Sequence, residues 1–390
     1  MVDIAHQAAI NPASAKHAAA ALRARVPLTA IEPGQWRALA QRAIEPNGYY
    51  LPGWELAVSA SARGRTDASA LPAFDGASTR LIGLMPVISL WRAWKVPLPA
   101  LVSAHPYGTL CSPLIDRDAP MEAATRLLQR AREAGAHALV LNDVALDGAA
   151  MAAINQVLDR DGLKPRVLSS YIRASLDATQ DGETLLHEAL GTKKLKELRR
   201  QRHRLEEHGP VAFDVARKPD EIRPALETFL QLESGGWKGK RGTALIQHAG
   251  DATFIRRAVP ALAETAQCEI VTLRAGTIPV AAGIVLRHQD RAFFFKLGID
   301  ERFAKYSPGV QLTLDLTRHL CADPAIASAD STASADHPMI NPIWRGRFAI
   351  GDVLIPLRRK DPVVALIHAA LSGLKIAHEA ARRVVHLLRK

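Results

Sequence analysis

Ser307, Pro308 and Gly309 join an apolar run to a segment that carries the start signals of a helix. The run, residues 292–299, predicts a buried strand bounded by charges. Residues 310–320 fit both strand and helix periodicity, but Ser307 suits an N-cap and Pro308 the first helical position, which favours a helix. Backbone N–H groups at a helix start lack partners within the helix, so an anion can bind there. The stretch predicts either a phosphate-binding turn or an ordinary strand-to-helix connection.

A second group of chemically useful residues lies in the glycine-rich segment 233–242. Trp237 could stack on a substrate and Lys238 could meet an anion, although Trp237 could equally anchor the core. The segment is not a P-loop, because Gly239-Lys240 is followed by Arg241 and lacks the correctly spaced preceding glycine. We therefore interpret it as a loop that closes over a ligand or packs on the core.

The composition is that of a folded protein with anionic partners. The 390 residues are 48% hydrophobic and 23% charged, with a net charge of +11 and a pI of about 9.8. Such an excess favours nucleic acid, an acidic membrane surface or a phosphorylated cofactor. The three isolated cysteines suggest neither a disulfide framework nor a zinc site, and no metal is expected. Without a secretory signal or a long apolar run, we expect a cytoplasmic protein.

Strand and helix patterns alternate along the whole chain and predict an α/β (α+β) fold. Helices are predicted over residues 122–134, 149–161 and 220–232, and a three-stranded meander over 268–299. Residues 49–54 are predicted to be extended, and residues 63–78 and 323–342 to be loops. The predicted division is a lead-in at 1–27, a first domain at 28–165, a second domain at 166–360 and a basic amphipathic helix at 361–390.

An ordered series of motifs resembles one known family. A strand with Arg173 to Leu176 precedes a basic helix at 193–208, and a Gly-Trp-Lys loop at 236–238 follows. Tyr306 to Gly309 come after the meander, and Asp336-His337-Pro338-Met339 stands before Trp344. Over residues 165–357 the chain resembles the GNAT-superfamily acyltransferases of the CelD-like group, which are associated with cellulose or envelope polysaccharide synthesis and related to FemAB-type enzymes.

The resemblance implies two tandem GNAT-like domains, each a mixed, largely antiparallel sheet flanked by helices. The first would be degenerate and the second would bind acyl-CoA. By position, the strand at 280–287 would pair with the pantetheine arm, through Ile284, Val285 and Leu286. The pyrophosphate would be contacted by Ser307, Gly309, Val310 and Gln311; of the glycines in the usual superfamily loop, only Gly309 can be aligned.

Acyl transfer to an amine requires a base, a polarised carbonyl and aligned reactants. His337 is the first candidate base because its ordinary pKa is suitable, followed by Glu233, Asp330 and Asp336. Each has a plainer interpretation: His337 could pack against Trp344, Glu233 could be a solvated charge, and aspartates often form turns. The candidate substrate contacts are Trp237, Lys238 and Trp344.

Two basic helices leave the partners open. Helix 193–208 could bind cofactor phosphates, an anionic saccharide or RNA, or could simply be solvated, and no RNA-binding fingerprint accompanies it. Helix 363–388 either docks on the protein's own core or lies on an acidic membrane. The sequence thus favours an N-acyltransferase that moves an acyl group from acetyl-CoA or another acyl-CoA to an amine, by resemblance on a sugar or envelope precursor. The alternatives are an aminoacyl-tRNA-dependent FemAB-type transferase and a non-catalytic scaffold.

Overall fold

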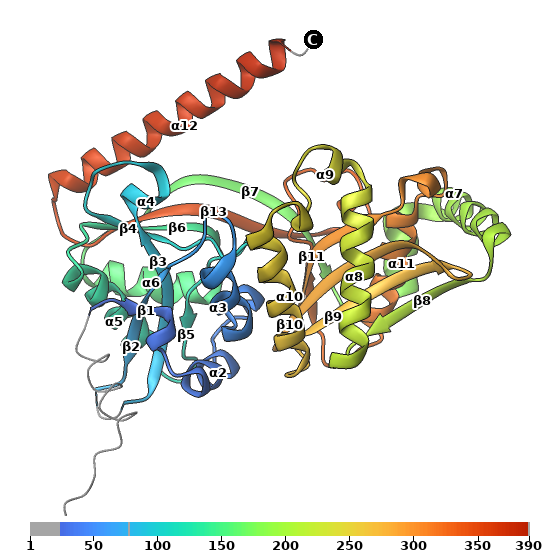
Figure 1. The fold of residues 1–390 in the computed structure, drawn as a ribbon. Coiled ribbons are helices and arrows are strands. Elements are labelled where there is room, and N and C mark those ends of the chain that lie inside the picture. Colours follow the sequence, from blue (N-terminus) through green and yellow to red (C-terminus); the bar gives the residue numbers. More distant parts are fainter. Residues whose placement is uncertain (1–23, 77–78, 389–390) are drawn as a thin grey trace, which may run out of the picture.

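One thirteen-stranded sheet runs through both halves of the molecule, with helices on both of its faces (Figure 1). The computed structural model describes residues 24–76 and 79–388, so most of the predicted lead-in at 1–27 lies outside the described residues. The strand order is β1-β2-β3-β4-β6-β13-β7-β12-β11-β10-β9-β8, and β5 pairs with β3. All but two of the neighbouring pairs, β4 with β6 and β11 with β12, are antiparallel. The predicted mixed, largely antiparallel α/β class is confirmed.

The first half contains, in order, β1 (Val26–Pro27), η1 (Leu28–Ala30), α2 (Pro33–Gln41), η2 (Gly48–Tyr50), α3 (Pro52–Ser61), β2 (Ser69–Phe74), β3 (Leu81–Ser89), α4 (Leu90–Trp94), β4 (Ala100–Ser103), β5 (Leu114–Ile115), α5 (Pro120–Glu133), β6 (Ala138–Ala145) and α6 (Ala149–Arg160). The second half contains β7 (Arg166–Asp177), α7 (Gly182–Leu205), η3 (Glu206–His208), β8 (Val211–Ala216), α8 (Pro219–Gly235), α9 (Trp237–Lys240), η4 (Leu245–Gln247), α10 (Ala249–Ala263), β9 (Cys268–Ala275), β10 (Ile278–His288), β11 (Arg291–Ile299), η5 (Glu301–Tyr306), α11 (Pro308–Cys321) and β12 (Ser328–Asp330). The last elements are β13 (Gly346–Pro356) and α12 (Pro362–Leu388).

The two halves repeat one pattern around a parallel strand pair. In the first half, β4 leads through α5 to the parallel β6, and in the second, β11 leads through α11 to the parallel β12. Both helices have 14 residues and begin with proline, Pro120 and Pro308, whose fixed φ and missing N–H suit the first helical position. The repeat explains why alternating strand and helix patterns appear along the whole chain.

Two long strands tie the halves together. β13, from the end of the chain, pairs with β6 of the first half, and β7 pairs with β12 of the second half. β7 and β13 also pair with each other over most of their length, from Gly346 opposite Ser175 to Leu354 opposite Arg166. The sheet is therefore continuous, and residues 346–356 complete the first half although they follow the second in sequence.

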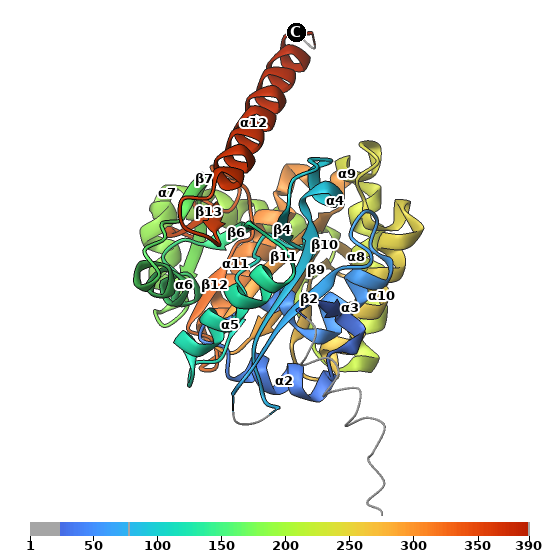
Figure 2. The ribbon, with the colours of Figure 1, turned by 90° about the vertical axis from the view of Figure 1, so that its left-hand side faces the viewer.

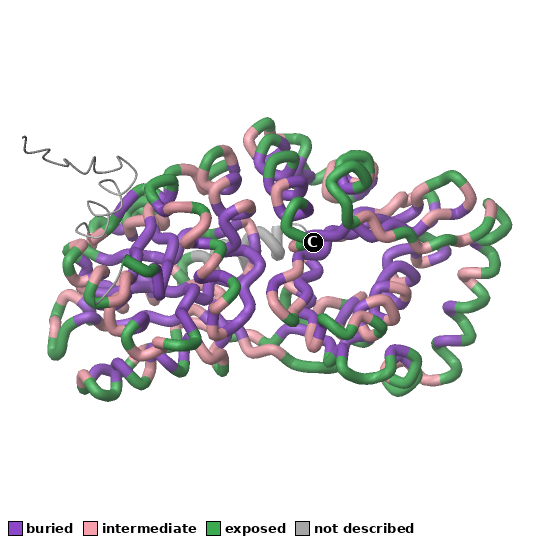
Figure 3. The backbone as a smooth tube through the Cα atoms, turned by 90° about the horizontal axis from the view of Figure 1, so that it is seen from below, coloured by how far each residue is buried: buried purple, intermediate pink, exposed green. Residues whose placement is uncertain are grey.

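Buried residues line the strands of both halves, while exposed residues concentrate on the outer helices (Figure 3). On one face, a single apolar core joins α2 and α3 of the first half to α8 and α10 of the second. On the opposite face, α5 and α6 cover the first half, and α7 and α11 cover the second. The shared core packs the two halves together on the side where α3 meets α10.

The C-terminal helix α12 begins on the first half and then leaves the body of the protein (Figures 1 and 2). Val364, Ile367 and Leu371 pack into an apolar cluster with β4, β6 and β13, as the docking interpretation predicts. Farther along, Ile376 has 67% of its surface exposed. No helix in the described part of the chain is both long enough and apolar enough to span a bilayer.

Most predicted elements are present. The meander and the helix after Pro308 are confirmed, and the predicted basic helix at 193–208 forms most of α7 beyond a kink at Gly191, whose φ is +69°. Four predictions are wrong. Residues 49–54 are largely helical, residues 63–78 contain β2, residues 233–242 belong largely to α8 and α9, and residues 323–342 contain β12. Short buried strands gain their stability from sheet neighbours that are distant in sequence, which local patterns do not reveal.

Candidate active site

β11 and β12 separate after three paired residues. Arg291, Ala292 and Phe293 pair with Ser328, Ala329 and Asp330, and β12 then ends while β11 continues to Ile299. A β-bulge coincides with the separation, because Ile284 of β10 lies opposite Lys296 and Val285 opposite Phe294, which leaves Phe295 without a partner. A bulge bends its strand and increases its twist. From Phe294 onward, the edge of β11 that faced β12 is therefore open.

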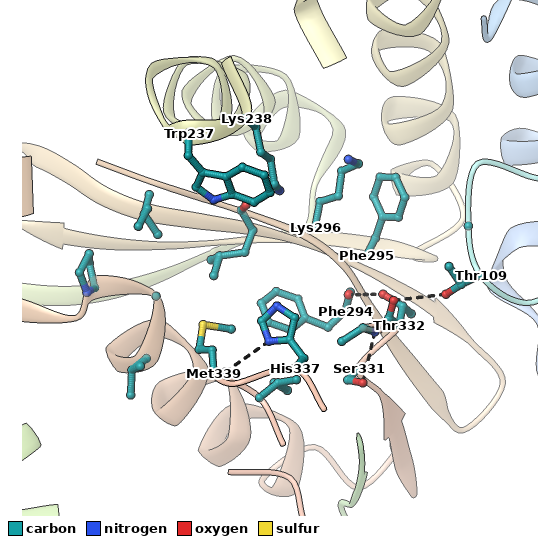
Figure 4. Close-up of a pocket in the computed structure, with 18 of the residues that line it drawn as sticks. Thr109, Trp237, Lys238, Phe294, Phe295, Lys296, Ser331, Thr332, His337 and Met339 are labelled. Atoms are coloured by element: carbon teal, nitrogen blue, oxygen red, sulfur yellow. Dashed lines mark hydrogen bonds between the residues drawn. The ribbon is translucent and has the colours of Figure 1, made fainter. Parts of the chain in front are cut away.

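A cavity of about 630 Å³ occupies this opening (Figure 4). Both halves and both faces of the sheet contribute to its wall. The lining residues are Tyr49, Arg65, Tyr107, Gly108, Thr109, Trp237, Lys238, Phe294, Phe295, Lys296, Leu297, Ile299, Ala304, Ser307, Pro308, Gly309, Val310, Ser331, Thr332, Ala333, His337, Met339 and Ile340.

Side chains close parts of the open edge. The Thr332 hydroxyl donates to the Phe294 carbonyl oxygen at 2.6 Å, and Lys238 Nζ donates to the Leu297 carbonyl oxygen at 2.9 Å. The Thr109 hydroxyl, from the first half, donates to the Thr332 carbonyl oxygen at 3.3 Å. Figure 4 shows Lys238 and Lys296 on one side of β11, and His337 and Met339 on the other. The cavity is thus reached from both faces of the sheet.

At one end of the cavity lies the N-terminus of α11. Ser307 has the left-handed φ of +55° and its side chain makes no capping bond, contrary to the N-cap expected from its residue type. Gly309 and Val310 stand in the first turn, where N–H groups lack partners within the helix. The Gln311 N–H is already bonded to the Ser307 carbonyl oxygen at 3.0 Å. Ser307, Gly309 and Val310 line the cavity as predicted for an anion site, but Gln311 does not.

The Gln311 side chain is also committed elsewhere. It is buried, and its amide donates to the Leu198 carbonyl oxygen at 2.8 Å, which ties α11 to α7. The predicted contact of Gln311 with a pyrophosphate is therefore wrong.

Two lysines and one carboxylate lie on the α9 side of the opening. Buried Glu233 accepts from the Leu245 N–H at 2.9 Å and lies 3.3 Å from Lys296 Nζ and 3.7 Å from Lys238 Nζ. Burial and the neighbouring Lys296 charge lower the pKa of Lys238 to about 8, although Glu233 acts in the opposite direction. Glu233 is not part of the cavity wall. It fixes the two lysines instead of meeting a substrate, so its prediction as a base is not supported by this geometry.

His337 lines the cavity on the α11 side, as Figure 4 shows. Its Nδ1 lies 3.3 Å from the Met339 N–H and accepts that hydrogen bond. Partial burial lowers the pKa of His337, and the Lys238 charge lowers it further. Because Nδ1 is the acceptor, Nε2 carries the hydrogen of the neutral imidazole, so His337 can take up a proton only at Nδ1, in place of the hydrogen bond from Met339.

The two candidate aspartates lie elsewhere. Asp330 is buried, forms a close ion pair with Arg173, and accepts from the Thr332 N–H at 2.8 Å. Arg173 also donates to the Thr109 carbonyl oxygen at 2.6 Å. Asp330 thus orders the point where the strands separate, and the predicted role as a base is wrong for it. Asp336 is exposed in a left-handed turn with φ +54°, outside the cavity, which contradicts its prediction too.

The sequence patterns missed the contribution of the first half. Tyr49, from η2, and Tyr107, Gly108 and Thr109, from the loop after β4, close one end of the cavity. The guanidinium of Arg65 lies over the Tyr107 ring, 4.4 Å from its centroid. The turn-forming Pro106 and Gly108 mark this loop in the sequence, but nothing local places it against β11.

Residues 192–337 match the family model described as an acetyltransferase (GNAT) domain. The matched part of the second half is therefore similar to a GNAT domain. The match begins in α7 and ends at His337, so it includes β11, β12 and the turn into α11. No curated protein matches the chain.

Solved structures share the fold of most of the chain, well beyond the residues that the family model matches. A crystal structure of FemX has 13% identity and a TM-score of 0.55, and the match covers 87% of this chain and 98% of FemX. L-PGS from Bacillus licheniformis has 12% identity and a TM-score of 0.51, with 87% and 97% covered. A conserved protein of unknown function from Bacteroides thetaiotaomicron has 11% identity and a TM-score of 0.51, with 84% and 98% covered. At these identities the similarity shows the fold alone.

Within the matched residues, the prediction for the pantetheine arm names the wrong strand, β10 instead of its neighbour β11. Ile284, Val285 and Leu286 are buried in β10, whose two edges are occupied by β9 and β11. A strand with both edges paired has no backbone groups left for a ligand. The open strand is β11, directly before the turn into α11. The sequence did indicate this strand, because β11 is the strand that directly precedes the turn and the helix start at Pro308.

The structure also corrects the prediction that Trp344 contacts a substrate. Its side chain is fully buried and donates to the Thr317 hydroxyl at 2.9 Å, so it supports α11 from behind and does not meet a substrate. Trp237, in contrast, lines the cavity and has 50% of its surface exposed, in agreement with the position expected of a substrate contact. Among the described residues, no group of three or more His, Cys, Asp and Glu side chains is placed to hold a metal ion.

Proposed function

We propose that this protein is an N-acyltransferase that takes an acyl group from acyl-CoA and transfers it to an amine. The observation that carries the proposal is the open edge of β11, which leads from the separation at Phe293 to the N-terminus of α11. The pantetheine arm is an extended chain with amide groups, and an extended chain can add to an open strand edge through backbone hydrogen bonds.

In this arrangement the two ends of the donor have different surroundings. The pyrophosphate lies at the N–H groups of Gly309 and Val310, where the helix dipole favours negative charge. The thioester lies near the bulge at Phe295, in the enclosed part of the cavity. Binding of the remote phosphates holds the thioester in place, which lowers the entropic cost of the reaction.

The amine approaches from the α9 side, past Trp237, Lys238 and Lys296. Its nitrogen attacks the thioester carbon, a C–N bond forms and the C–S bond breaks, and the CoA thiolate leaves. The surplus proton of the amine passes to His337 Nδ1, which gives up its hydrogen bond from the Met339 N–H; the lowered pKa of His337 keeps the imidazole neutral beforehand. By its family resemblance, the acceptor is an amino group on a sugar or envelope precursor.

Calorimetric titration of CoA and acetyl-CoA tests the donor site. Gly309→Asp places a carboxylate at the first turn of α11, where it should repel the pyrophosphate and weaken binding at least ~100-fold. Gly309→Ala adds the same Cβ, whose nearest neighbours are the Leu297, Met339 and Ile299 side chains, without the charge. The alanine variant should bind within about threefold of the natural protein. No binding at millimolar CoA by the folded natural protein would refute the proposal.

A second candidate function is transfer from aminoacyl-tRNA. Lys193, Lys196, Arg199, Arg200 and Arg204 are exposed along α7 and have no ion-pair partner in the described part of the chain. A gel-shift titration with bulk tRNA, repeated at several salt concentrations, tests this candidate. If tRNA binding is electrostatic, the logarithm of the binding constant falls linearly with the logarithm of the salt concentration. The double variant Arg199→Ser with Arg200→Ser should make that slope shallower. A folded protein that binds neither CoA nor tRNA would favour the scaffold interpretation.

A further inference from the structure

The Tyr49 side chain is a buried polar group without an evident structural purpose. The residue has no exposed surface, it lines the cavity, and its hydroxyl has no hydrogen-bond partner among the described residues. Leaving a buried hydroxyl unpaired lowers the stability of the folded protein. A phenylalanine would fill the same space without that cost, so the hydroxyl requires an explanation.

The ring of Tyr49 is held in one position. It makes edge-to-face contacts with Trp54, Phe293 and Phe295, at centroid distances of 5.8, 5.7 and 6.1 Å. On another side Gly108 approaches so closely that a Cβ there would lie 2.2 Å from the ring. The backbone of η2 is itself fixed, since the Asn47 side chain accepts from the Tyr49 N–H at 2.9 Å. The ring, and with it the hydroxyl, is therefore held rigidly in the wall of the cavity.

The polar groups nearest Tyr49 form hydrogen bonds and an ion pair with other residues. The Thr332 hydroxyl donates to the Phe294 carbonyl oxygen, and Asp330 is occupied by Arg173 and the Thr332 N–H. These residues lie at the point where β11 and β12 separate, next to the cavity. The Tyr49 hydroxyl is left as an unpaired hydrogen-bond donor of a residue in the cavity wall, where the donor's reacting end would lie.

We propose that the Tyr49 hydroxyl donates a hydrogen bond to the carbonyl oxygen of the donor's acyl group. The inference rests on the proposed function. As the amine nitrogen bonds to the carbonyl carbon, the π electrons move onto that oxygen, and the hydrogen bond stabilises the resulting oxyanion. When the C–S bond breaks, the carbonyl re-forms and the thiolate carries away the electron pair. Tyr49 keeps its proton throughout.

Two properties of the site support this role. Burial raises the pKa of Tyr49 well above its ordinary value, and the Asp330 charge acts in the same direction, so the phenol stays protonated. The hydroxyl also comes from the first half, whereas the open strand edge and the helix N-terminus come from the second. A first half that resembles a degenerate domain would then supply a catalytic residue to its neighbour.

Tyr49→Phe removes only the hydroxyl and separates a catalytic from a structural role. We expect the thermal midpoint of unfolding to stay the same or rise, while kcat for transfer from acetyl-CoA falls about 100-fold and KM changes less than about threefold. Tyr50→Phe is the matched control. The Tyr50 hydroxyl is also buried but donates to the Ala104 carbonyl oxygen at 3.2 Å, outside the cavity. That variant should lower the midpoint and leave kcat within about twofold.

A binding measurement isolates the bond to the carbonyl oxygen. Acetyl-CoA carries that oxygen and the thioether S-ethyl-CoA does not, so Tyr49→Phe should weaken the first by about two- to threefold and leave the second unchanged. Equal effects on both ligands, unchanged kcat, or a midpoint lowered as in Tyr50→Phe would overturn the role of Tyr49 while acyl-CoA binding stands. If the natural protein binds neither ligand, the proposed function fails and the Tyr49 inference fails with it.

Discussion

The parallel strand pairs of the two halves begin alike and end differently. β4 pairs with β6 at three positions, Ala100 to Val102, and β11 pairs with β12 at three positions, Arg291 to Phe293. Each pair encloses a 14-residue helix that starts with proline. Beyond the paired residues, the second half opens into the cavity, whereas the first half is filled by its own chain.

The filling segment is the longer connection after β4. It runs from residue 104 to 119, whereas the connection after β11 runs only from 300 to 307. Leu110, Cys111 and Ser112 are fully buried in the first-half gap, where the Cys111 N–H donates to the Asp143 carbonyl oxygen at 3.1 Å. The short connection instead folds as η5 and leaves the edge of β11 open. Both halves therefore have a parallel strand pair that separates. The path of the connection after the first strand of the pair decides whether the gap is filled by the chain or left open as a cavity.

The largest expected effect comes from breaking the ion pair at the second-half separation. Arg173→Met leaves Asp330 buried without its partner, which should lower the free energy of unfolding by about 3–5 kcal/mol. Urea unfolding followed by circular dichroism measures the loss. The double variant Arg173→Met with Asp330→Leu is the control and should recover most of it, because no unpaired charge remains. A single variant as stable as the natural protein would show that the pair does not hold the separated strands.

The next effect tests whether the first-half gap is only structural. Leu110→Ala removes apolar volume from a fully buried position and should cost about 2–5 kcal/mol. Because Leu110 is not part of the cavity wall, CoA affinity should stay within about threefold when measured below the unfolding transition. Loss of CoA binding by a folded Leu110→Ala protein would mean that the first-half filling also shapes the ligand site.

Filling the second-half gap should weaken CoA binding and leave stability nearly unchanged, the reverse of the result expected for Leu110→Ala. Val310 lines the cavity and is only partly buried, so Val310→Trp should occupy the path toward the α11 N-terminus. We expect CoA affinity to fall at least ~100-fold, which is about 2.7 kcal/mol, with a thermal midpoint within a few degrees of the natural one. Retained binding would place the donor elsewhere in the molecule.

This contrast also explains what the sequence could predict. The turn at Ser307 to Gly309 was found because its start signals are local, and Trp237, Lys238 and His337 were found because they stand out in loops. Each of these residues lines the cavity. The fold class followed from alternating patterns and from motifs in the second half.

The remaining lining residues depend on contacts between distant segments. Tyr49 and Thr109 precede β11 by more than 180 residues and reach the cavity through the core shared by α3 and α10. Glu233, Asp330 and Trp344 have residue types suited to chemistry, but burial and fixed partners give them structural roles. No spacing rule distinguishes a carboxylate held by a lysine or arginine from one that is free to react.

The smallest effect concerns the lysines on the α9 side of the open gap. Glu233→Gln removes the negative charge that raises the pKa of Lys238, so that pKa should fall below about 8, by on the order of one unit. The glutamine oxygen can still accept from the Leu245 N–H, which limits structural change. Carbon-13 NMR of reductively methylated protein, with Lys238→Arg used to assign the signal, measures the titration directly. A pKa that stays constant or rises would show that Glu233 does not set the charge of this side of the cavity.

Lys238 also makes the free energy of unfolding increase with pH. The folded pKa of Lys238 lies below its usual 10.5, so between about pH 8 and 10.5 the unfolded chain binds a proton that the folded protein does not. The contribution of Lys238 to the free energy of unfolding therefore rises with pH across this window and is lost as the pH falls through about 8. Lys238→Met, which cannot titrate, should remove that part of the slope in urea titrations at pH 8 to 10. An unchanged slope would mean that Lys238 is solvated like an ordinary surface lysine, and the second-half gap would then be more open to water than its burial implies.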